Sequence, residues 1–150
     1  MPPAGLARRE NNVRRIGGLI LPERIVCSDA PAAIGPYSQA VRAGNFIFVS
    51  GQIPLDPATG QVTGRDAAEQ AARVMENITA ILRQAGAAWG DVVKTTIYLL
   101  DMADFGAVNE VYGRYLADPP PARACVGVSA LPRGVRVEIE VAAYLDRRGI

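Results

Sequence analysis

The residues best suited to chemistry lie near the end of the sequence, where residues 122–128 alternate between two sets of side chains. Arg123, Cys125 and Gly127 occupy one set of positions, and small or apolar residues occupy the other. Successive side chains of a strand point to opposite faces, so the alternation predicts a strand. A guanidinium grips a carboxylate bidentately and keeps its charge at any working pH. The thiol is equally consistent with a functional group and with a small buried hydrophobe.

A second alternating stretch, residues 135–142, places Glu138 and Glu140 on the face opposite its apolar side chains. A glutamate can orient water and accept a proton. If both stretches turn their apolar faces to the same core, a hairpin pairing Arg123 with Glu140 and Cys125 with Glu138 is one allowed register. From alternation alone, the favoured interpretation is a solvated sheet face whose cross-strand ion pairs contribute about 0.2–1 kcal/mol each.

The composition excludes several kinds of chemistry. Histidine is absent, so Ser-His-Asp and Cys-His catalysis and the common histidine-ligated zinc and iron sites cannot be built, and we expect no metal. Lys94 is the single lysine and therefore the sole candidate for a Schiff base with pyridoxal phosphate. An exposed strand lysine is the favoured interpretation, because most lysines are solvated.

Length and composition indicate one globular domain. The 150 residues are 49% hydrophobic and 21% charged, which is ordinary for a folded protein. No apolar run approaches the ~18 residues that cross a bilayer, so we expect no membrane partner. Cys27 and Cys125 lack the CxxC spacing, which favours a reduced, cytoplasmic protein over a disulfide scaffold.

Residues 1–22 differ from the rest in charge. They contain four arginines and one glutamate, a net charge of +3, which leaves −2 on residues 23–150. We expect a flexible N-terminal extension followed by a single domain at residues 23–150, and a transit peptide is the less favoured alternative for the extension. A slightly acidic body predicts no nucleic-acid partner, because such binding needs clustered cations.

The predicted elements follow the order ββ(β)αβαββ. Asp66, with Glu69 three residues later, resembles a capping box at the start of the first helix. An α+β domain results, with both helices packed on one face of a mixed sheet. The elements are strands at 24–27 and 45–50, a helix between Asp66 and Gly86, a strand at 92–99, a helix that Asp104 caps and residues 118–121 end, and strands at 122–129 and 135–145.

Residues 121–126 (PARACV) and 135–140 (VRVEIE) together resemble the signature of the RidA (YjgF-type) reactive intermediate deaminases. Three further stretches resemble motifs of that family in the same order: residues 30–39 (APAAIGPYSQ), 50–54 (SGQIP) and 91–96 (DVVKTT). The resemblance covers about residues 25–147. It implies a chorismate-mutase-like fold, a homotrimer with active sites in clefts between subunits, and no cofactor.

The resemblance also implies an activity, hydrolysis of 2-aminoacrylate-type enamines and imines to 2-keto acids and ammonia, as in 2-iminobutanoate/2-iminopropanoate deaminases. The family's carboxylate-binding arginine falls on Arg123 and its water-positioning glutamate on Glu138. The remaining substrate contacts that it implies are Tyr37, Ser50, Gly51 and Cys125.

The sequence departs from the family pattern between Tyr112 and Pro121, where it is a few residues short and three prolines precede the arginine motif. Pocket size and substrate range are therefore open. Two other functions stay open as well. One is an endoribonuclease or translation inhibitor, as some family members are described. The other is a regulatory protein that binds small carboxylates without turnover, which would need Arg123 and not Glu138.

Overall fold

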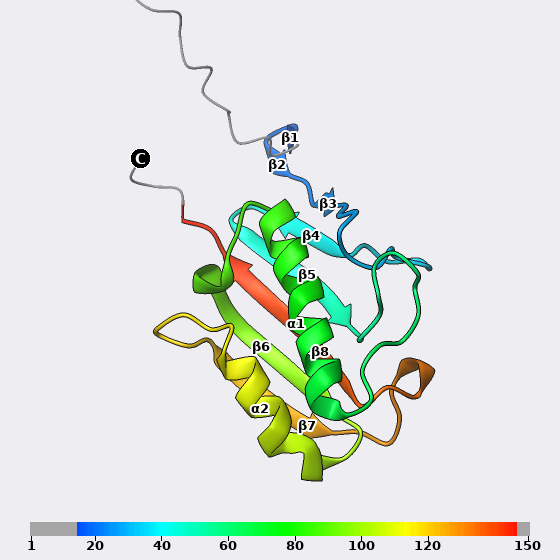
Figure 1. Cartoon of the computed structure of the whole chain (residues 1–150). Coiled ribbons are helices and arrows are strands. Elements are labelled where there is room, and N and C mark those ends of the chain that lie inside the picture. The colour runs from blue at the N-terminus through cyan, green and yellow to red at the C-terminus, as the bar shows by residue number, and fades with distance from the viewer. Residues whose placement is uncertain (1–14, 147–150) are drawn as a thin grey trace, which may run out of the picture.

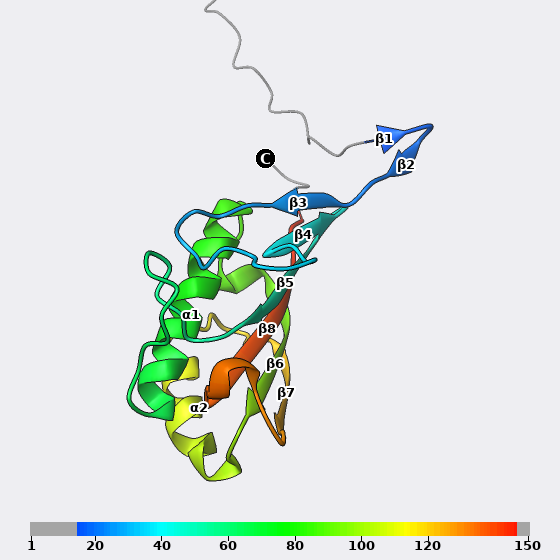
Figure 2. The same cartoon turned by 90° about the vertical axis from the view of Figure 1, so that its right-hand side faces the viewer.

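A computed structural model describes residues 15–146 and shows a six-stranded sheet with both long helices on one face (Figures 1 and 2). Only β6 and β7 run parallel, so the sheet is mixed. In spatial order the strands are β3 (Glu23–Ile25), β4 (Ala40–Ala43), β5 (Phe46–Gln52), β8 (Val137–Tyr144), β6 (Val92–Leu99) and β7 (Ala122–Gly127), and the helices are α1 (Ala67–Gln84) and α2 (Phe105–Gly113). The predicted fold class and order of elements are confirmed.

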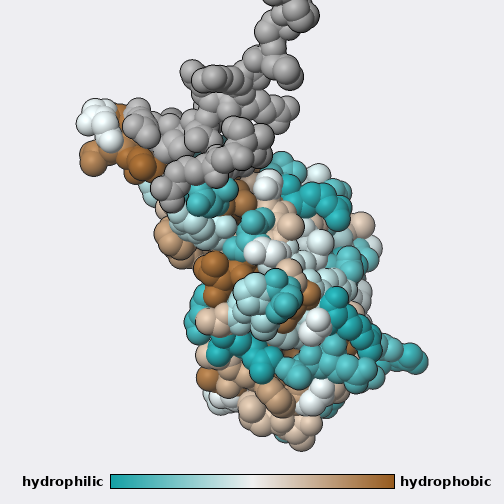
Figure 3. All heavy atoms as spheres, turned by 90° about the vertical axis from the view of Figure 1, so that its left-hand side faces the viewer, coloured by the Kyte–Doolittle hydropathy of each residue, from teal (hydrophilic) through white to brown (hydrophobic). Residues whose placement is uncertain are grey.

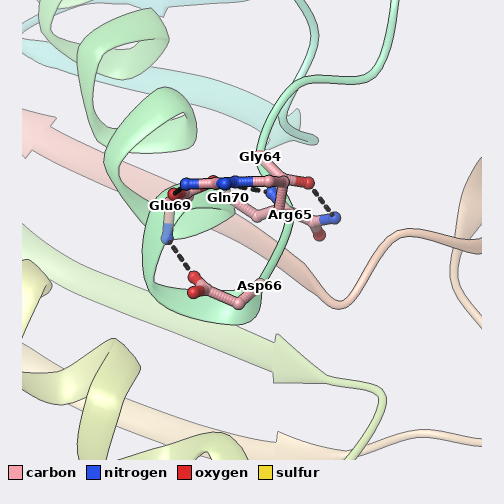
Figure 4. Close-up of polar contacts among 5 residues, drawn as sticks. All are labelled: Gly64, Arg65, Asp66, Glu69 and Gln70. Carbon is pink, nitrogen blue, oxygen red and sulfur yellow. Dashed lines mark hydrogen bonds and ion pairs between the residues drawn. The ribbon is translucent and has the colours of Figure 1, made fainter.

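Helix α1 begins and ends as its sequence predicts. Asp66 Oδ1 accepts a hydrogen bond from the Glu69 amide at 2.9 Å, as expected of an N-cap. The Glu69 carboxylate accepts from the Arg65 amide at 2.7 Å, one residue earlier than a standard capping box (Figure 4). After the helix, Gly86 adopts a φ of +79°, where residues with a Cβ are disfavoured.

The core lies between the sheet and the two helices. The odd-numbered side chains of β8 face it, and Val137, Ile139 and Ala143 are all fully buried. Helix α1 covers them with one apolar stripe, formed by residues three and four apart. The stripe includes Ala71, Val74, Met75, Ile78, Ile81 and Leu82. Glu138 and Glu140 consequently lie on the face away from the helices, as the alternation predicts.

The predicted hairpin of β7 with β8 is wrong, because β6 lies between the two strands. β7 is an edge strand that pairs in parallel with β6, with Thr95 opposite Arg123 and Ile97 opposite Cys125. Parallel strands need a crossover connection, and α2 supplies it between β6 and β7.

The predicted facing of β7 is wrong for the same reason. Arg123 and Cys125 share a face, as expected, but it is the face that carries the helices, since their partners Thr95 and Ile97 are buried in the core. The small and apolar residues of β7 lie on the other face, where Val126 is 41% exposed. On this edge strand the apolar side chains therefore lie on the face away from the core.

Residues 15–20 form a small hairpin, β1 (Arg15–Ile16) with β2 (Leu19–Ile20), which the sequence did not predict. Its apolar side chains Ile16, Leu19 and Ile20 are exposed. The hairpin extends away from the sheet (Figure 2), and hydrophobic surface gathers at one upper corner of the space-filling view (Figure 3). The rest of the predicted extension, residues 1–14, lies outside the described residues. Among residues 15–146 no helix has the length and apolarity needed to cross a membrane.

Three short 3₁₀ turns complete the chain between the longer elements: Trp89–Asp91, Met102–Asp104 and Pro132–Gly134. The prediction that Asp104 caps α2 is wrong. Asp104 occupies the N-cap position, but its side chain accepts no capping hydrogen bond from the helix. Asp101 instead accepts from the Ala103 amide at 2.9 Å, and the Asp104 carboxylate lies 3.9 Å from the Arg136 guanidinium.

Candidate active site

Arg123 is held by one side of helix α2. Its guanidinium lies over the rings of Phe105 and Tyr112, 5.5 and 5.3 Å from their centroids, and donates to Asn109 Oδ1 at 2.5 Å. These three residues recur at helical spacing, so one helix face presents all of them. We call this group the arginine cradle. Thr95, fully buried, shares a 2.7 Å hydrogen bond with the Tyr112 hydroxyl and so fixes that ring.

The cradle opens into a cavity of about 390 Å³, lined also by Leu116, Pro120 and Pro121. Arg123 is exposed there and, within residues 15–146, makes no carboxylate salt bridge. A planar cation held over aromatic rings, with donors left over, is suited to binding a carboxylate bidentately. Two of the three prolines that depart from the family pattern, Pro120 and Pro121, thus form part of the wall of this cavity.

Cys125 follows Arg123 on the same face of β7 and packs partly buried against the core. Burial raises the pKa of its thiol, and the nearby Arg123 charge opposes that shift only in part. The thiol therefore stays protonated at neutral pH and is a poor nucleophile. Within one chain its position indicates a small packing residue beside the arginine.

A second cavity, of about 370 Å³, lies on another part of the chain and contains Tyr37, Gly51 and Glu138. We call it the glutamate pocket. Gly51 makes room for the carboxylate: a Cβ at Gly51 would lie 3.0 Å from Glu138 Cδ and closer still to Oε1. The register between β5 and β8 shifts between Val49 and Gln52, so Gly51 falls in an irregularity of β5 beside Glu138.

The pKa of Glu138 is raised, first by burial, which disfavours the charged form, and second by the negative charge of Glu140. A carboxylate with a raised pKa is a stronger proton acceptor than an ordinary glutamate. Perturbed carboxyl groups in cavities are candidates for proton transfer, and Glu138 combines both properties.

Gln39 holds the segment that carries Tyr37. Its buried amide donates to the carbonyls of Cys27 and Pro31 at 2.9 and 2.8 Å and accepts from the Cys27 amide at 2.8 Å. Ser50 fastens the same segment, because its hydroxyl donates to the Ser38 carbonyl at 2.5 Å. The predicted substrate contact Ser50 therefore has its hydroxyl engaged with the protein backbone.

The structure separates the predicted site residues into two groups. Tyr37, Gly51 and Glu138 share the glutamate pocket, whereas Arg123 in its cradle and the neighbouring Cys125 lie on the helix side of the sheet. Within one chain the sheet lies between them.

The three residues that hold Arg123, and Gln39, were not among the predicted site residues. A signal for the cradle was present, since Phe105, Asn109 and Tyr112 stand at i, i+4 and i+7 of a predicted helix, with an amide among apolar neighbours. Gln39 has no comparable signal, because its partners are backbone groups of a loop.

Comparison with known proteins agrees with this architecture. The family model described as endoribonuclease L-PSP matches residues 27–145. The mouse 2-iminobutanoate/2-iminopropanoate deaminase is 50% identical over 124 residues, which are 83% of this chain and 92% of that protein.

Two solved structures share the fold at similar coverage. RidA from the Antarctic bacterium Psychrobacter sp. is 46% identical with a TM-score of 0.79, over 82% of this chain and 99% of that one. Escherichia coli TdcF with bound serine is 40% identical with a TM-score of 0.78, over 83% and 99%. The chain therefore belongs to the endoribonuclease L-PSP family, the family of the RidA and YjgF-type reactive intermediate deaminases.

Proposed function

We propose that this protein is a hydrolytic deaminase that converts 2-aminoacrylate-type enamines and imines to 2-keto acids and ammonia. The observation that carries the proposal is that the chain presents two complementary groups. Arg123 lies over aromatic rings and has no carboxylate partner among residues 15–146. A separate pocket holds Glu138, whose raised pKa makes it a stronger proton acceptor. The mouse relative, named as a deaminase of this kind, supports the substrate class. Free thiols at Cys27 and Cys125 support a cytoplasmic location.

Arg123 binds the carboxylate of the substrate. Its ring contacts with Phe105 and Tyr112 and its bond to Asn109 hold the guanidinium plane before substrate arrives, so little side-chain freedom is lost on binding. E. coli TdcF, which was solved with bound serine, shows that a relative takes an amino acid, itself a small carboxylate.

Glu138 activates water. In the imine the C2 carbon is electrophilic, so the water oxygen bonds to C2 while Glu138 accepts a proton from the water and passes it to the imine nitrogen, whose double bond to C2 opens. Glu138 then accepts the proton of the new hydroxyl group and passes it to the amino nitrogen, so that the C–N bond breaks, ammonia leaves and the C2–O bond becomes a carbonyl. Proton transfer by a positioned group of this kind contributes about 10²–10⁴-fold. Tyr37 lines the same pocket.

The active site is proposed to form between subunits of a homotrimer. Arg123 and Glu138 point to opposite sides of one sheet, so one chain does not bring them to a single substrate. The sheet face that carries Glu138 also exposes Phe46, Phe48 and Val126 at 43%, 51% and 41%. Apolar exposure of this kind is typical of a surface that a partner covers, and a second copy would bring its cradle to the glutamate pocket.

The activity is tested by generating 2-aminoacrylate with a serine dehydratase in the presence of semicarbazide, which traps the intermediate. The protein should lower the trapped fraction, and Arg123→Ala should not. If the wild-type protein leaves the trapped fraction unchanged, the deaminase function is wrong. Full activity in Glu138→Gln would remove the glutamate from the mechanism.

The shared site is tested by complementation. Arg123→Ala and Glu138→Gln subunits, each inactive alone, are unfolded, mixed in equal amounts and refolded together. In a cyclic trimer whose sites draw one residue from each neighbour, about one quarter of the sites regain both residues. Recovery of roughly that share of wild-type activity supports the shared site, whereas no recovery in mixed trimers identified by mass spectrometry contradicts it.

A regulatory protein that binds carboxylates without turnover is the second candidate, because the cradle alone can hold such a ligand. Isothermal titration with serine separates the two functions. Binding that requires Arg123 while the trapping assay shows no turnover would favour the regulatory function. The endoribonuclease function has no support of this kind, since histidine is absent and the body carries a net negative charge.

A further inference from the structure

A tyrosine and a second glutamate adjoin Glu138 on the sheet face away from the helices. Tyr98 on β6 stands directly opposite Glu138 on β8, and its hydroxyl reaches along the strand to donate to Glu140 Oε1 at 2.7 Å. Glu138 and Glu140 lie two residues apart on one face, about 7 Å along the strand. Both are half-buried, and so is Tyr98.

We propose that Glu140, held in place by the Tyr98 hydroxyl, is a positioning residue whose negative charge makes Glu138 a stronger proton acceptor and so sets the pH range of the site. This inference rests on the proposed function and deepens it. It assigns a role to two residues that need not touch the substrate.

The geometry gives each residue a separate part. The Tyr98 hydroxyl donates to Glu140 Oε1 and so fixes where the Glu140 carboxylate lies relative to Glu138. The pKa of Tyr98 is raised in turn, chiefly by that bond, so the hydroxyl stays a donor across the neutral range. A fixed negative charge beside Glu138 disfavours a second one, which adds to the effect of burial.

Other groups near Glu138 do not reproduce this effect. Tyr37 lines the pocket with its ring, and β5 contributes Gly51, which has no side chain. Arg133 from the Pro132–Gly134 turn also lines the pocket, but its guanidinium donates to the Gly60 carbonyl at 2.6 Å.

On the far side of Glu140, Lys94 lines a small cavity that contains the Glu140 side chain, and a bound partner subunit would add Arg123 near Glu138. Both cations are present equally with and without the Glu140 charge, so a comparison of variants at Glu140 isolates its contribution.

The test is a titration of Glu138 by carbon-13 NMR of the carboxyl group in the full-length protein, with Glu138→Gln identifying its signal. In Glu140→Gln the pKa of Glu138 should fall by about half to one pH unit, the size expected of one charge at this distance in a partly hydrated site. Tyr98→Phe should also lower the pKa of Glu138, but by less, since Glu140 remains and loses only the hydrogen bond that holds it in place.

Activity gives a second readout. If Glu138 works as a base, the acid limb of the kcat/KM profile should move to lower pH in Glu140→Gln by the same amount. The matched control is Glu76→Gln, because Glu76 accepts from the Tyr115 hydroxyl at 2.6 Å in the same kind of pair on the helix side. That variant should move neither the NMR titration nor the limb.

Two results overturn the inference: a Glu138 pKa that is unchanged or higher in Glu140→Gln, or one that moves equally in Glu76→Gln. A limb that shifts in Glu140→Gln but not in Tyr98→Phe removes Tyr98 from the proposed role. Loss of the proposed function is distinguishable, because a wild-type protein without deaminase activity still reports the coupling through the NMR titration.

Discussion

Gly51 should be important for activity because the space beside it accommodates the Glu138 carboxyl group. In Gly51→Ala the new Cβ would lie 3.0 Å from Glu138 Cδ, against the roughly 3.5–4.0 Å at which carbon atoms attract. The carboxyl group of Glu138 must therefore move by about 0.5–1 Å, and a displacement of this size at a reacting group can cost up to about 10²-fold. We expect kcat to fall about 10- to 100-fold.

The substitution should spare both substrate binding and folding. The substrate carboxylate binds at Arg123 and not at Glu138, so KM should change less than kcat. The clashing atoms belong to the end of a flexible side chain, so the free energy of unfolding should change by about 1 kcal/mol or less, the low end of overpacking effects. The assay is steady-state kinetics with in situ substrate, together with urea unfolding of the same preparations.

Two further proteins make the experiment decisive. Gly90→Ala is the matched control, since its Cβ would meet only the Ala117 Cβ at an ordinary 3.7 Å. In a Glu138→Gln background, Gly51→Ala should have little additional effect on the residual rate, because both changes act through one carboxylate. Wild-type kcat in Gly51→Ala, or effects that simply add in the double variant, would refute the reasoning.

Three other predictions concern the groups that support the site. Asn109→Ala should raise KM about tenfold with a smaller change in kcat, because Arg123 loses its charged hydrogen bond; an unchanged KM would show that the aromatic rings alone orient the guanidinium. Gln39→Leu leaves buried backbone groups without partners, a loss of roughly 3 kcal/mol that should lower Tm by about 6–12 °C in calorimetry. A Tm within about 2 °C of wild type, which corresponds to about 1 kcal/mol or less, would contradict this role of Gln39. Burial and the Glu76 bond raise the pKa of Tyr115 to about 12, so stability should decline as pH rises from the unfolded value of about 10 through 12. Tyr115→Phe should lack both that decline and the last step of an ultraviolet tyrosine titration, and retention of either would contradict the assignment.

Local signals in the sequence were sufficient for most elements of the fold. Asp66 and Gly86 define α1 through backbone chemistry that acts within a few residues, and the alternation of β8 identifies its buried face because both of its neighbours and a helix cover it. Such features do not depend on which strands pair.

The pairing and facing of β7 could not be predicted in the same way. Strands that follow one another in sequence usually pair, so the alternation favoured a β7–β8 hairpin, but β7 pairs with β6 across the α2 crossover. At the edge of the sheet, Ala122 and Ala124 satisfy an apolar pattern on the uncovered face, and Arg123 is accommodated on the helix side because α2 offers rings and an amide to hold it. The motif resemblance identified the site residues without indicating that one chain keeps them apart.

The place of β8 in the sheet has a consequence for how the chain folds during synthesis. β8 follows every other strand of the sheet in sequence, yet it is bonded to β5 on one side and to β6 on the other. Until residues 137–144 have left the ribosome, the chain holds two unjoined ribbons, β3–β5 and β6–β7, each with an open edge and an uncovered apolar face. Pairings between distant segments form slowly, and open edges of this kind invite aggregation. A chain released before β8 should therefore be a client of chaperones and proteases, with no part of the sheet able to stand alone.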